Sequence, residues 1–413
     1  MTRICIVTPS HVSFQPRALR EADALHDAGY DVRVVSVRTD ASLDAFDAEL
    51  LRSRAWRLRA VDLTSETATQ ARRWTASARL RTAQRITAAG LGSRRMAAHA
   101  AVKGAGELAA LVCAEPADLF IAHTQATLEA AFAGARRFDA AMAFDCEDLL
   151  GDGATREAAA MRTLEAAHVG SCVYVSVPSR AMGARLAARY PLADRLVVLE
   201  NVPEIVPTSL VPPRARPRSG ALRVHWFGQT AGLDRGLDDA ARAIGLMRER
   251  GELHIVGLAT DAVQLALREM AGAGASRVLF HPRISPDALI ETVARYDAGI
   301  ACERPDHPSY GVTLTNKIFG YLAAGLAVAA TDTPGQRELL DETPDAGVIY
   351  PFGNAGALAQ HLDRWARDRD ALLRAQDAAW HAARRQYSWD VVRRRFLERI
   401  AAVTTGHVRV AAR

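Results

Sequence analysis

Short apolar runs alternate with longer amphipathic stretches along the first half of the chain. The apolar runs cover residues 4–9, 31–37, 118–123, 141–145, 172–177 and 195–201. Runs of this length without polar alternation are typical of strands that are buried on both faces of a sheet. Residues 17–29, between the first two runs, carry apolar side chains at helical spacing and end at a glycine. The pattern predicts β–α–β units, and therefore a parallel sheet covered by helices on both faces.

The pattern breaks after residue 201 and then starts again. Residues 202–220 contain five prolines and show neither helical nor strand periodicity, which is typical of a semi-rigid linker. Apolar runs return at residues 222–228, 252–257, 277–282, 297–303, 326–331 and 347–351. We therefore expect an α/β protein with two doubly wound, Rossmann-like domains.

The expected boundaries follow from the same pattern. They are 1–205 for the first domain, 206–220 for the linker, 221–386 for the second domain, and 387–413 for a C-terminal helix that packs back on the first domain. Ligands of such sheets bind at the carboxyl ends of the strands. We expect the binding site in a cleft across which the two domains face each other.

Composition narrows the class of protein. A chain of 413 residues exceeds the usual size of one hydrophobic core, and a formal net charge of +5 is too small to indicate nucleic-acid binding. The five cysteines form no CxxC pair, so we expect buried thiols in a reducing compartment, not a metal cluster or a disulfide framework. The sequence shows no signal-peptide pattern and no run of ~20 apolar residues that could span a membrane. It therefore predicts a cytoplasmic protein.

Residues 67–106 form a segment of unusual charge, with seven arginines and Lys103 but no acidic residue. One interpretation is the solvated face of helices in an insertion. The other is a basic surface that contacts an anionic acceptor or a membrane from its cytoplasmic side. The sequence leaves both open.

Hydroxyl, amide and ammonium groups meet at a predicted helix start in the second half of the chain. Thr313, Thr315, Asn316 and Lys317 lie at the beginning of a helix that ends near Gly325. A helix N-terminus offers free N–H groups and the positive end of the helix dipole, which together favour a phosphate group. The hydroxyl groups would equally suit ordinary helix capping. Phosphate binding and capping are the two hypotheses for this stretch.

Several stretches, taken in order, resemble a known enzyme family. The strongest match is LTNKIFGYLAAGLAVAATDTPGQREL (314–339), and the next is HWFGQTAGLDRGLDDAARAI (225–244). Further matches are RVLFHPRISPDALIETVARYDAGIACE, FDCEDLL, VSVPSRAMGARLAARY, VLENVP and YSWDVVRRRFLERI. Together they resemble the retaining, metal-independent nucleotide-sugar glycosyltransferases of the GT-B fold, group 1 type, often called family four. The resemblance covers nearly the whole chain and includes a pattern of the bacterial subgroup.

The resemblance implies transfer of a hexosyl-type sugar from a nucleoside-diphosphate donor to an acceptor hydroxyl. The acceptor would be a glycan, a lipid-linked saccharide or a small molecule, within the synthesis of a polysaccharide, a glycolipid or a cell-envelope glycoconjugate. No metal, no cofactor other than the nucleotide-sugar co-substrate, and no nucleic-acid partner is expected. Two alternatives stay open: a sugar-nucleotide epimerase of the same fold, and a nucleotide-sugar-binding protein that has lost catalysis.

In the second domain, the resemblance assigns the leaving diphosphate to two catalytic cations, Arg235 and Lys317. Donor binding is carried over to these two and to Gly228, Gln229, Gly257, Arg283, Glu303, Thr315 and Asn316. Many relatives carry glutamates, for the donor sugar and for the ribose, at the positions of Val312 and Gly320. Neither residue here can accept a hydrogen bond through its side chain, and Glu303 at a predicted strand end is the expected substitute.

In the first domain, the resemblance places carboxylates beside the acceptor. Asp145 and Glu147, in FDCEDLL, follow a predicted strand, and either could orient or deprotonate an acceptor hydroxyl as a catalytic residue. His11 and Ser13 follow the first strand and His123 ends a later one, and we expect these three to contact the acceptor. The loop at His11 lacks the glycines of relatives, so close backbone approach to a phosphate is not expected there.

Overall fold

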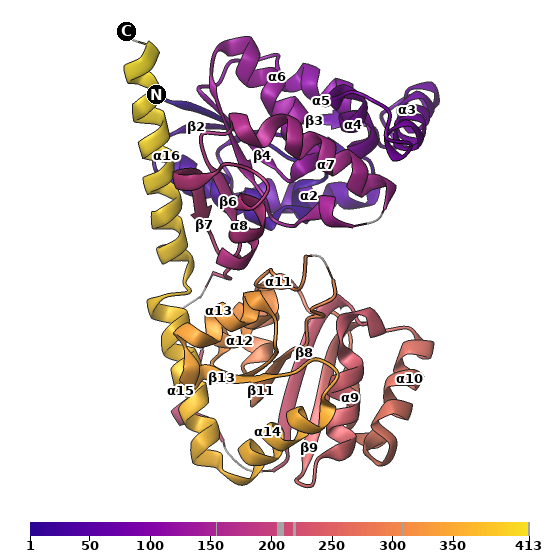
Figure 1. The fold of residues 1–413 in the computed structure, drawn as a ribbon, viewed down its shortest axis with the longest axis vertical. Helices are drawn as coiled ribbons and strands as arrows, with labels where there is room; N and C mark the ends of the chain where they lie inside the picture. The colour runs from indigo at the N-terminus through magenta and orange to yellow at the C-terminus, as the bar shows by residue number, and fades with distance from the viewer. Residues whose placement is uncertain (154, 205–209, 218–219, 308, 412–413) are drawn as a thin grey trace. The chain divides into compact units, whose positions relative to one another are not determined.

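The computed structural model describes residues 1–153, 155–204, 210–217, 220–307 and 309–411, and it divides into two compact units. Unit 1 consists of residues 1–178, 182–199 and 393–413, and unit 2 consists of residues 179–181 and 200–392. Each unit is built on a parallel sheet covered by helices, so the predicted α/β class with two doubly wound domains is confirmed (Figure 1). In the expected linker, residues 206–209 and 218–219 lie outside the described residues.

Unit 1 contains a seven-stranded sheet with the order β3-β2-β1-β4-β5-β6-β7. Its strands are β1 (Arg3–Val7), β2 (Asp31–Arg38), β3 (Arg57–Asp62), β4 (Leu119–His123), β5 (Ala141–Asp145), β6 (Val175–Val177) and β7 (Leu196–Val198). Its helices are α1 (Pro16–Asp27), α2 (Asp44–Leu51), α3 (Gln70–Ala88), α4 (Arg94–Ala101), α5 (Ala105–Val112), α6 (Leu128–Phe138), α7 (Arg156–His168) and α8 (Arg180–Ala187). Strands β4 and β5 are buried at every position, because their apolar side chains are covered on both faces of the sheet.

The C-terminal helix α16 (Trp389–Ala411) groups with unit 1 from residue 393 onward. Arg395 Nη1 donates to the carbonyl of Val198 over 3.2 Å, and Arg399 Nη2 donates to the carbonyl of Asp194 over 3.2 Å. These bonds attach the helix to the segment around β7.

None of the helices in the described part of the chain combines the length and the apolar character needed to cross a bilayer.

Unit 2 contains a six-stranded sheet with the order β10-β9-β8-β11-β12-β13. Its strands are β8 (Leu222–Thr230), β9 (Gly251–Leu258), β10 (Val278–His281), β11 (Ala298–Ala301), β12 (Ala327–Thr331) and β13 (Gly347–Tyr350). Its helices are α9 (Leu237–Leu246), α10 (Asp261–Ala271), α11 (Pro286–Val293), α12 (Asn316–Ala324), α13 (Pro334–Glu342), α14 (Ala355–Arg367) and α15 (Arg369–Arg385). The strand order reverses between β8 and β11, and in unit 1 between β1 and β4. Such switch points open crevices at the carboxyl ends of the strands, where ligands bind.

Candidate functional site

The N-terminus of α12 in unit 2 is open. Its N-cap residue, Thr315, makes no capping hydrogen bond, and the backbone N–H groups of Asn316 and Lys317 have no acceptor among the described residues. By contrast, helices α10, α11, α13, α14 and α15 of the same unit are each capped by a side chain. Helix α12 therefore presents free N–H groups and the positive end of its dipole. The arrangement excludes the hypothesis that Thr315 serves as an ordinary helix cap.

Thr315 and Lys317 both bind the carboxylate of Glu303, which follows β11. Thr315 Oγ1 donates to Glu303 Oε1 over 2.8 Å, and Lys317 Nζ donates to the same oxygen over 3.1 Å. Glu303 is buried, and the Lys317 ammonium also lies 5.5 Å from the centroid of a Trp226 ring. An ammonium group has three donors, and Glu303 occupies one of them, so the others can bind an anion. The carboxylate thus holds a cation at the open end of α12.

Arg235 lies just before α9, next to the end of β11. Its Nη1 donates to the hydroxyl of Tyr310, and its guanidinium carbon lies 5.4 Å from the centroid of the Tyr310 ring. The backbone of Arg235 approaches β11 closely at Gly236, which has φ 73°. A Cβ atom at Gly236 would lie 2.0 Å from the carbonyl oxygen of Cys302, so glycine is required there. Arg235 is therefore fixed at the same strand end that Glu303 follows.

Backbone contacts join the ends of β8, β9 and β10. Gly257 has φ 147°, and a Cβ atom there would lie 2.4 Å from the carbonyl oxygen of Gly228. Arg283, after β10, donates from Nε to the carbonyl of Gln229 over 3.1 Å. These four predicted donor-binding residues thus lie at one edge of the sheet, and their contact with a donor stays a prediction. The backbone packing already explains why a glycine stands at 257.

Val312 and Gly320, the two positions where relatives carry glutamates, lie in apolar surroundings. Val312 is buried, and Gly320 lies inside α12, where a Cβ atom would sit 3.0 Å from the ring of Phe227. A glutamate at 320 would need that aromatic ring to move. Glu303, the expected substitute, follows β11 and binds Thr315 and Lys317, and its contact with a donor stays a prediction.

Five charged side chains form a buried network at the carboxyl edge of the unit 1 sheet. Arg17 and Glu21 come from α1, His123 and Asp145 end β4 and β5, and Glu147 follows β5. The register of the sheet places His123 opposite Asp145. Arg17 Nη2 donates to Asp145 Oδ1 over 2.7 Å, and Arg17 Nη1 donates to a backbone carbonyl over 2.7 Å. The network therefore connects α1 to the ends of two central strands.

The ring of His123 is held between carboxylates on both sides. Its Nε2 lies 3.1 Å from Glu21 Oε2, and its Nδ1 lies 3.1 Å from Glu147 Oε1 and 3.3 Å from Asp145 Oδ2. Both nitrogens must donate, which requires the doubly protonated ring. Burial opposes the charge, but the carboxylates outweigh it and raise the pKa of His123 to about 10. His123 is therefore a fixed cation at neutral pH.

The carboxylates of this network differ in their access to solvent. The side chain of Glu147 is 23% exposed, whereas those of Asp145 and His123 are fully buried. Burial would raise the pKa of Glu147, but the hydrogen bond and charge of His123, together with Arg17, lower it below its usual range. For Asp145, burial raises the pKa to about 6, while Arg17 limits the rise. Glu147 is thus an ionised carboxylate with partial access to solvent, whereas the full burial of His123 contradicts its predicted contact with an acceptor.

His11 and Ser13, the other predicted acceptor residues, are engaged in the loop after β1. The buried ring of His11 accepts hydrogen bonds at Nε2 from the N–H groups of Thr39 (2.9 Å) and Asp40 (3.1 Å). Its Nδ1 therefore carries the proton and donates to Asp47 over 2.8 Å. The N–H of Ser13 donates to the same carboxylate over 3.0 Å. His11 has no ring nitrogen left for a sugar hydroxyl, so its position indicates a role in fixing the loop.

Among the described residues, two groups of side chains have the spacing of metal ligands: His11 with Asp44 and Asp47, and Glu21 with His123 and Asp145. In the first group, both nitrogens of His11 are already used within the loop. In the second, the protonated His123 has no lone pair to offer a metal, and Arg17 supplies the balancing charge. Neither donor set therefore fits a resident cation.

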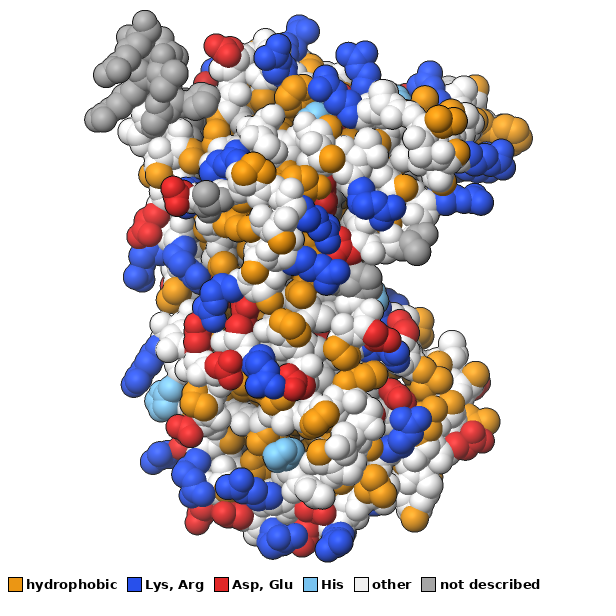
Figure 2. All heavy atoms as spheres, viewed as in Figure 1, with side chains coloured by type: hydrophobic (Ala, Val, Ile, Leu, Met, Phe, Trp, Pro, Cys, Tyr) orange, Lys and Arg blue, Asp and Glu red, His pale blue; other side chains and the backbone are white. Residues whose placement is uncertain are grey.

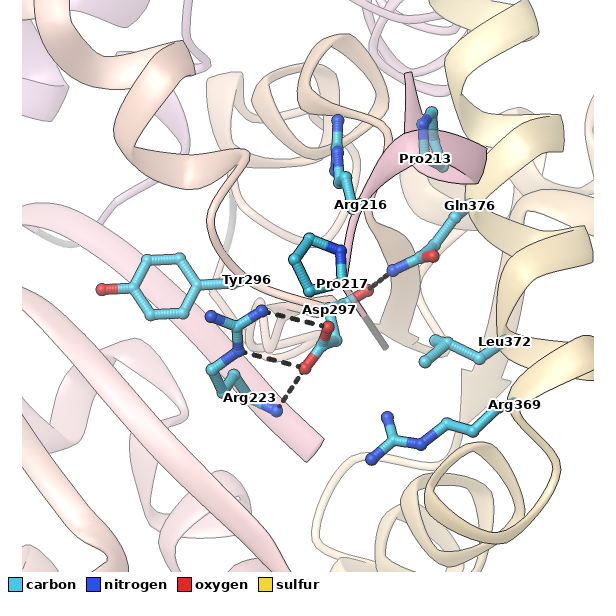
Figure 3. Close-up of a pocket in the computed structure, with 9 residues that line it drawn as sticks. All are labelled: Pro213, Arg216, Pro217, Arg223, Tyr296, Asp297, Arg369, Leu372 and Gln376. Atoms are coloured by element: carbon cyan, nitrogen blue, oxygen red, sulfur yellow. Dashed lines mark hydrogen bonds and ion pairs between the residues drawn. The ribbon is translucent and has the colours of Figure 1, made fainter. Parts of the chain in front are cut away.

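A pocket in unit 2 lies at the opposite edge of the sheet (Figure 3). Arg223 begins β8 and Asp297 precedes β11, so the pocket is at the amino ends of the strands. The N–H of Arg223 donates to Asp297 Oδ2 over 2.8 Å, and Gln376 donates to the Asp297 carbonyl over 2.8 Å. Arg223, Asp297 and Gln376 are thus paired with one another, and Arg216 and Arg369, which also line the pocket, donate to backbone carbonyls outside it.

The sequence analysis missed Arg17 and Glu21, which complete the unit 1 network, and Tyr310, which holds Arg235. Arg17 and Glu21 stand one helical turn apart on a helix whose neighbouring positions 18, 22 and 25 are apolar and buried. Arg17 and Glu21 stand at positions i and i+4 beside the apolar face of a helix that directly follows the first strand. This pattern would have allowed their identification from the sequence. Tyr310 offers no comparable signal, because the loop that contains it has no periodicity.

Comparisons with known proteins point to one family. Residues 222–368 match the family described as glycosyl transferases group 1. No curated protein sequence matches the chain. Among solved structures, the chain is similar to a sucrose-phosphate synthase from Thermosynechococcus elongatus at 14% identity and a TM-score of 0.69, covering 98% of this chain and 100% of that one.

Two further structures show the same likeness over the whole chain. A glycosyltransferase from Rickettsia africae is 15% identical with a TM-score of 0.65, over 98% of each chain. HepE from Anabaena, solved in complex with UDP-glucose, is 13% identical with a TM-score of 0.65, over 97% of this chain and 100% of that one. At these identities the structures establish the fold, which is GT-B, and the group 1 match lies on the unit that holds the open helix α12.

Proposed function

We propose that this chain, a glycosyltransferase of the GT-B fold whose unit 2 matches the group 1 family, transfers its sugar with retention of anomeric configuration and without a metal ion. The observation that carries the proposal is the open N-terminus of α12, where free N–H groups meet the Lys317 ammonium. A departing diphosphate gathers negative charge in the transition state, and preorganised donors of this kind stabilise it. Arg235 is the second cation, since a guanidinium can hold two phosphate oxygens at once.

The unit 1 network would act on the acceptor. The acceptor oxygen forms its bond to the anomeric carbon while the bond from that carbon to the β-phosphate oxygen breaks. The bonding electrons leave with the nucleoside diphosphate, and the hydroxyl proton passes to the departing phosphate or to Glu147. In this scheme Glu147 orients the hydroxyl, while His123 and Arg17 keep the Glu147 carboxylate ionised and in place.

Donor and acceptor classes can be narrowed by what similar proteins bind. HepE is solved with UDP and with UDP-glucose, so uridine-diphosphate sugars are the first donors to test. The acceptor would be a glycan, a lipid-linked saccharide or a small molecule, in the synthesis of a polysaccharide, a glycolipid or another glycoconjugate.

Acceptor-dependent release of nucleoside diphosphate tests the proposal. The protein is incubated with UDP-, GDP-, dTDP- and ADP-sugars and a panel of saccharide acceptors, with and without EDTA, and the product anomer is read by NMR. We expect one donor to give release that requires acceptor, survives EDTA and conserves the anomeric configuration. Donor binding without release for any acceptor would instead indicate a binding protein. Inversion, or loss with EDTA that Mg²⁺ or Mn²⁺ restores, would overturn retention or metal independence.

A further inference from the structure

Helix α3 lies at the edge of unit 1, away from the sheet, where it packs on α4 and α7 (Figure 1). Only Ala76, Ala83 and Thr87 of its residues are buried. These small side chains fall on one narrow stripe, so the rest of the helix surface faces solvent. Thr69 caps the N-terminus by accepting from the N–H of Arg72, which makes α3 a well-formed helix in spite of its exposure.

The side of α3 opposite the buried stripe carries a tryptophan and two arginines. At 3.6 residues per turn, Trp74, Arg81 and Arg85 project from the same side. Trp74 is 70% exposed. Exposed Leu91 and Arg95 follow within the same acid-free segment. We call these five residues the α3 surface. A single exposed apolar side chain is common on soluble proteins, but Trp74 and Leu91 stand in one acid-free basic segment.

The positive charges of the α3 surface are uncompensated. Arg81, Arg85 and Arg95 form no ion pair with any described residue, whereas Arg57 and Arg59 of β3 in the same unit both pair with Glu115. Residues 67–106 contain no acidic residue that could neutralise them. Figure 2 shows basic and hydrophobic side chains side by side at this end of unit 1. The surface is therefore complementary to an anionic partner that also accepts apolar side chains.

We propose that the α3 surface docks on a membrane that contains anionic lipids. Arginines near such a membrane are attracted to its phosphate groups, and the indole ring of tryptophan favours the interface between headgroups and acyl chains. The α3 surface presents arginines and an exposed tryptophan together, so both kinds of group can contact such an interface at once. Duplex nucleic acid would satisfy the arginines, but it offers no apolar layer into which the exposed Trp74 and Leu91 could insert. The inference goes beyond sugar transfer and does not depend on which donor is used.

Vesicle co-sedimentation tests the proposal on the full chain. Vesicles of phosphatidylcholine alone are compared with vesicles of equal parts phosphatidylcholine and phosphatidylglycerol, at low and high salt. We expect binding to the anionic vesicles only, weakened by salt because the Debye length shrinks. Each arginine near an anionic surface strengthens binding about fivefold, so Arg81→Gln with Arg85→Gln should weaken it about 25-fold. Trp74→Ala should weaken binding at both salt concentrations.

A matched control removes the same charge elsewhere on unit 1. Arg136 and Arg156 are exposed and, within the described residues, form no ion pair, so Arg136→Gln with Arg156→Gln should leave vesicle binding within about twofold of the parent protein. Thermal unfolding monitored by circular dichroism checks that all variants fold. Equal weakening in the control, or equal binding to both kinds of vesicle, would overturn the proposal. So would binding of the parent protein to single-stranded RNA or heparin with no binding to anionic vesicles.

Discussion

Lys317 is the residue whose removal tests the donor site most sharply. Its ammonium is fixed by Glu303 at the open end of α12. Lys317→Ala should lower kcat about hundredfold, because loss of one preorganised donor to a developing anion costs about 10²–10³ in rate. The measurement is nucleotide release under saturating donor and acceptor. Lys317→Arg, which keeps the charge, should retain part of the activity, and an unchanged kcat in a folded Lys317→Ala protein would remove this residue from the mechanism.

Glu147 provides the corresponding test on the acceptor side. Because its pKa is lowered, the carboxylate stays ionised at mildly acidic and neutral pH. Glu147→Gln should reduce transfer about a hundredfold if the carboxylate positions or deprotonates the acceptor hydroxyl. Donor affinity, measured by calorimetry with UDP, should not change. The neighbouring Asp148→Asn substitution is the matched control and should have a small effect. Equal losses of transfer activity in both variants would show that transfer depends on the conformation of the segment and not on the Glu147 carboxylate.

The candidate residues themselves could be found from sequence only in part. Lys317, Thr315 and Glu303 were each predicted to bind the donor, and the structure brings them together because all three stand at the ends of predicted elements. The network around His123 was found incompletely. Its partners Arg17 and Glu21 lie more than 100 positions away along the chain, and their contacts depend on how α1 packs against β4 and β5. The burial of His11, after β1, and of His123, at the end of β4, could not be predicted, since it depends on partners from other elements.

Helix α12 is stabilised at its far end by Arg216. Arg216 Nη2 donates to the carbonyl of Ala324 over 2.6 Å, and Nη1 donates to that of Gly325 over 3.3 Å. A cation at a helix C-terminus satisfies free carbonyls and interacts favourably with the dipole. Burial lowers the pKa of Arg216 to about 10, so the guanidinium remains charged at neutral pH. The element that carries the candidate phosphate site thus has a half-buried cation at its opposite end.

Arg216→Ala should destabilise unit 2 through these two carbonyls. Loss of hydrogen bonds from a charged group costs about 2 kcal/mol, which corresponds to a decrease in Tm of about 4–8 °C for a unit of this size. Differential scanning calorimetry measures the shift. Arg216→Lys cannot form the same two-pronged contact and should give an intermediate Tm. An unchanged Tm in Arg216→Ala would mean that water replaces the guanidinium without cost.

At the level of elements, the pattern of apolar runs predicted every described strand except β3, which lies at one edge of the unit 1 sheet. Strands β4, β5 and β12 are buried at every residue, so each appears in the sequence as an unbroken apolar run. Strand β3 has arginines at 57 and 59 that face solvent and pair with Glu115. Its RLRAVD sequence alternates polar and apolar residues, so it lacks the unbroken apolar run by which the other strands were predicted. Only the pairing with β2 establishes it as a strand.

For the whole molecule, the protonated His123 links stability to pH. Its pKa is raised from 6.5 to about 10 in the folded chain, chiefly because the charges of Glu21, Glu147 and Asp145 outweigh the effect of burial. A raised pKa of a base stabilises the fold fully below the unfolded value, near 6.5. That stabilisation decreases as pH rises and is lost above about 10. Alkaline solution should therefore loosen the contact of α1 with β4 and β5.

His123→Gln isolates this contribution from the other groups that titrate in alkali. At pH 7 the variant leaves Glu21 and Glu147 facing each other without the cation between them, so its free energy of unfolding should be lower than that of the parent by a few kcal/mol. At pH 10.5 the parent has lost its own imidazolium, and the difference between the two proteins should shrink to less than about 1 kcal/mol. Urea unfolding followed at both pH values measures it, on the transition assigned to unit 1. Gln125→Asn, a buried amide substitution near the same sheet edge, should show no such convergence. A difference that is equal at both pH values would mean that His123 is neutral in the folded chain and that the network is held by Arg17 alone.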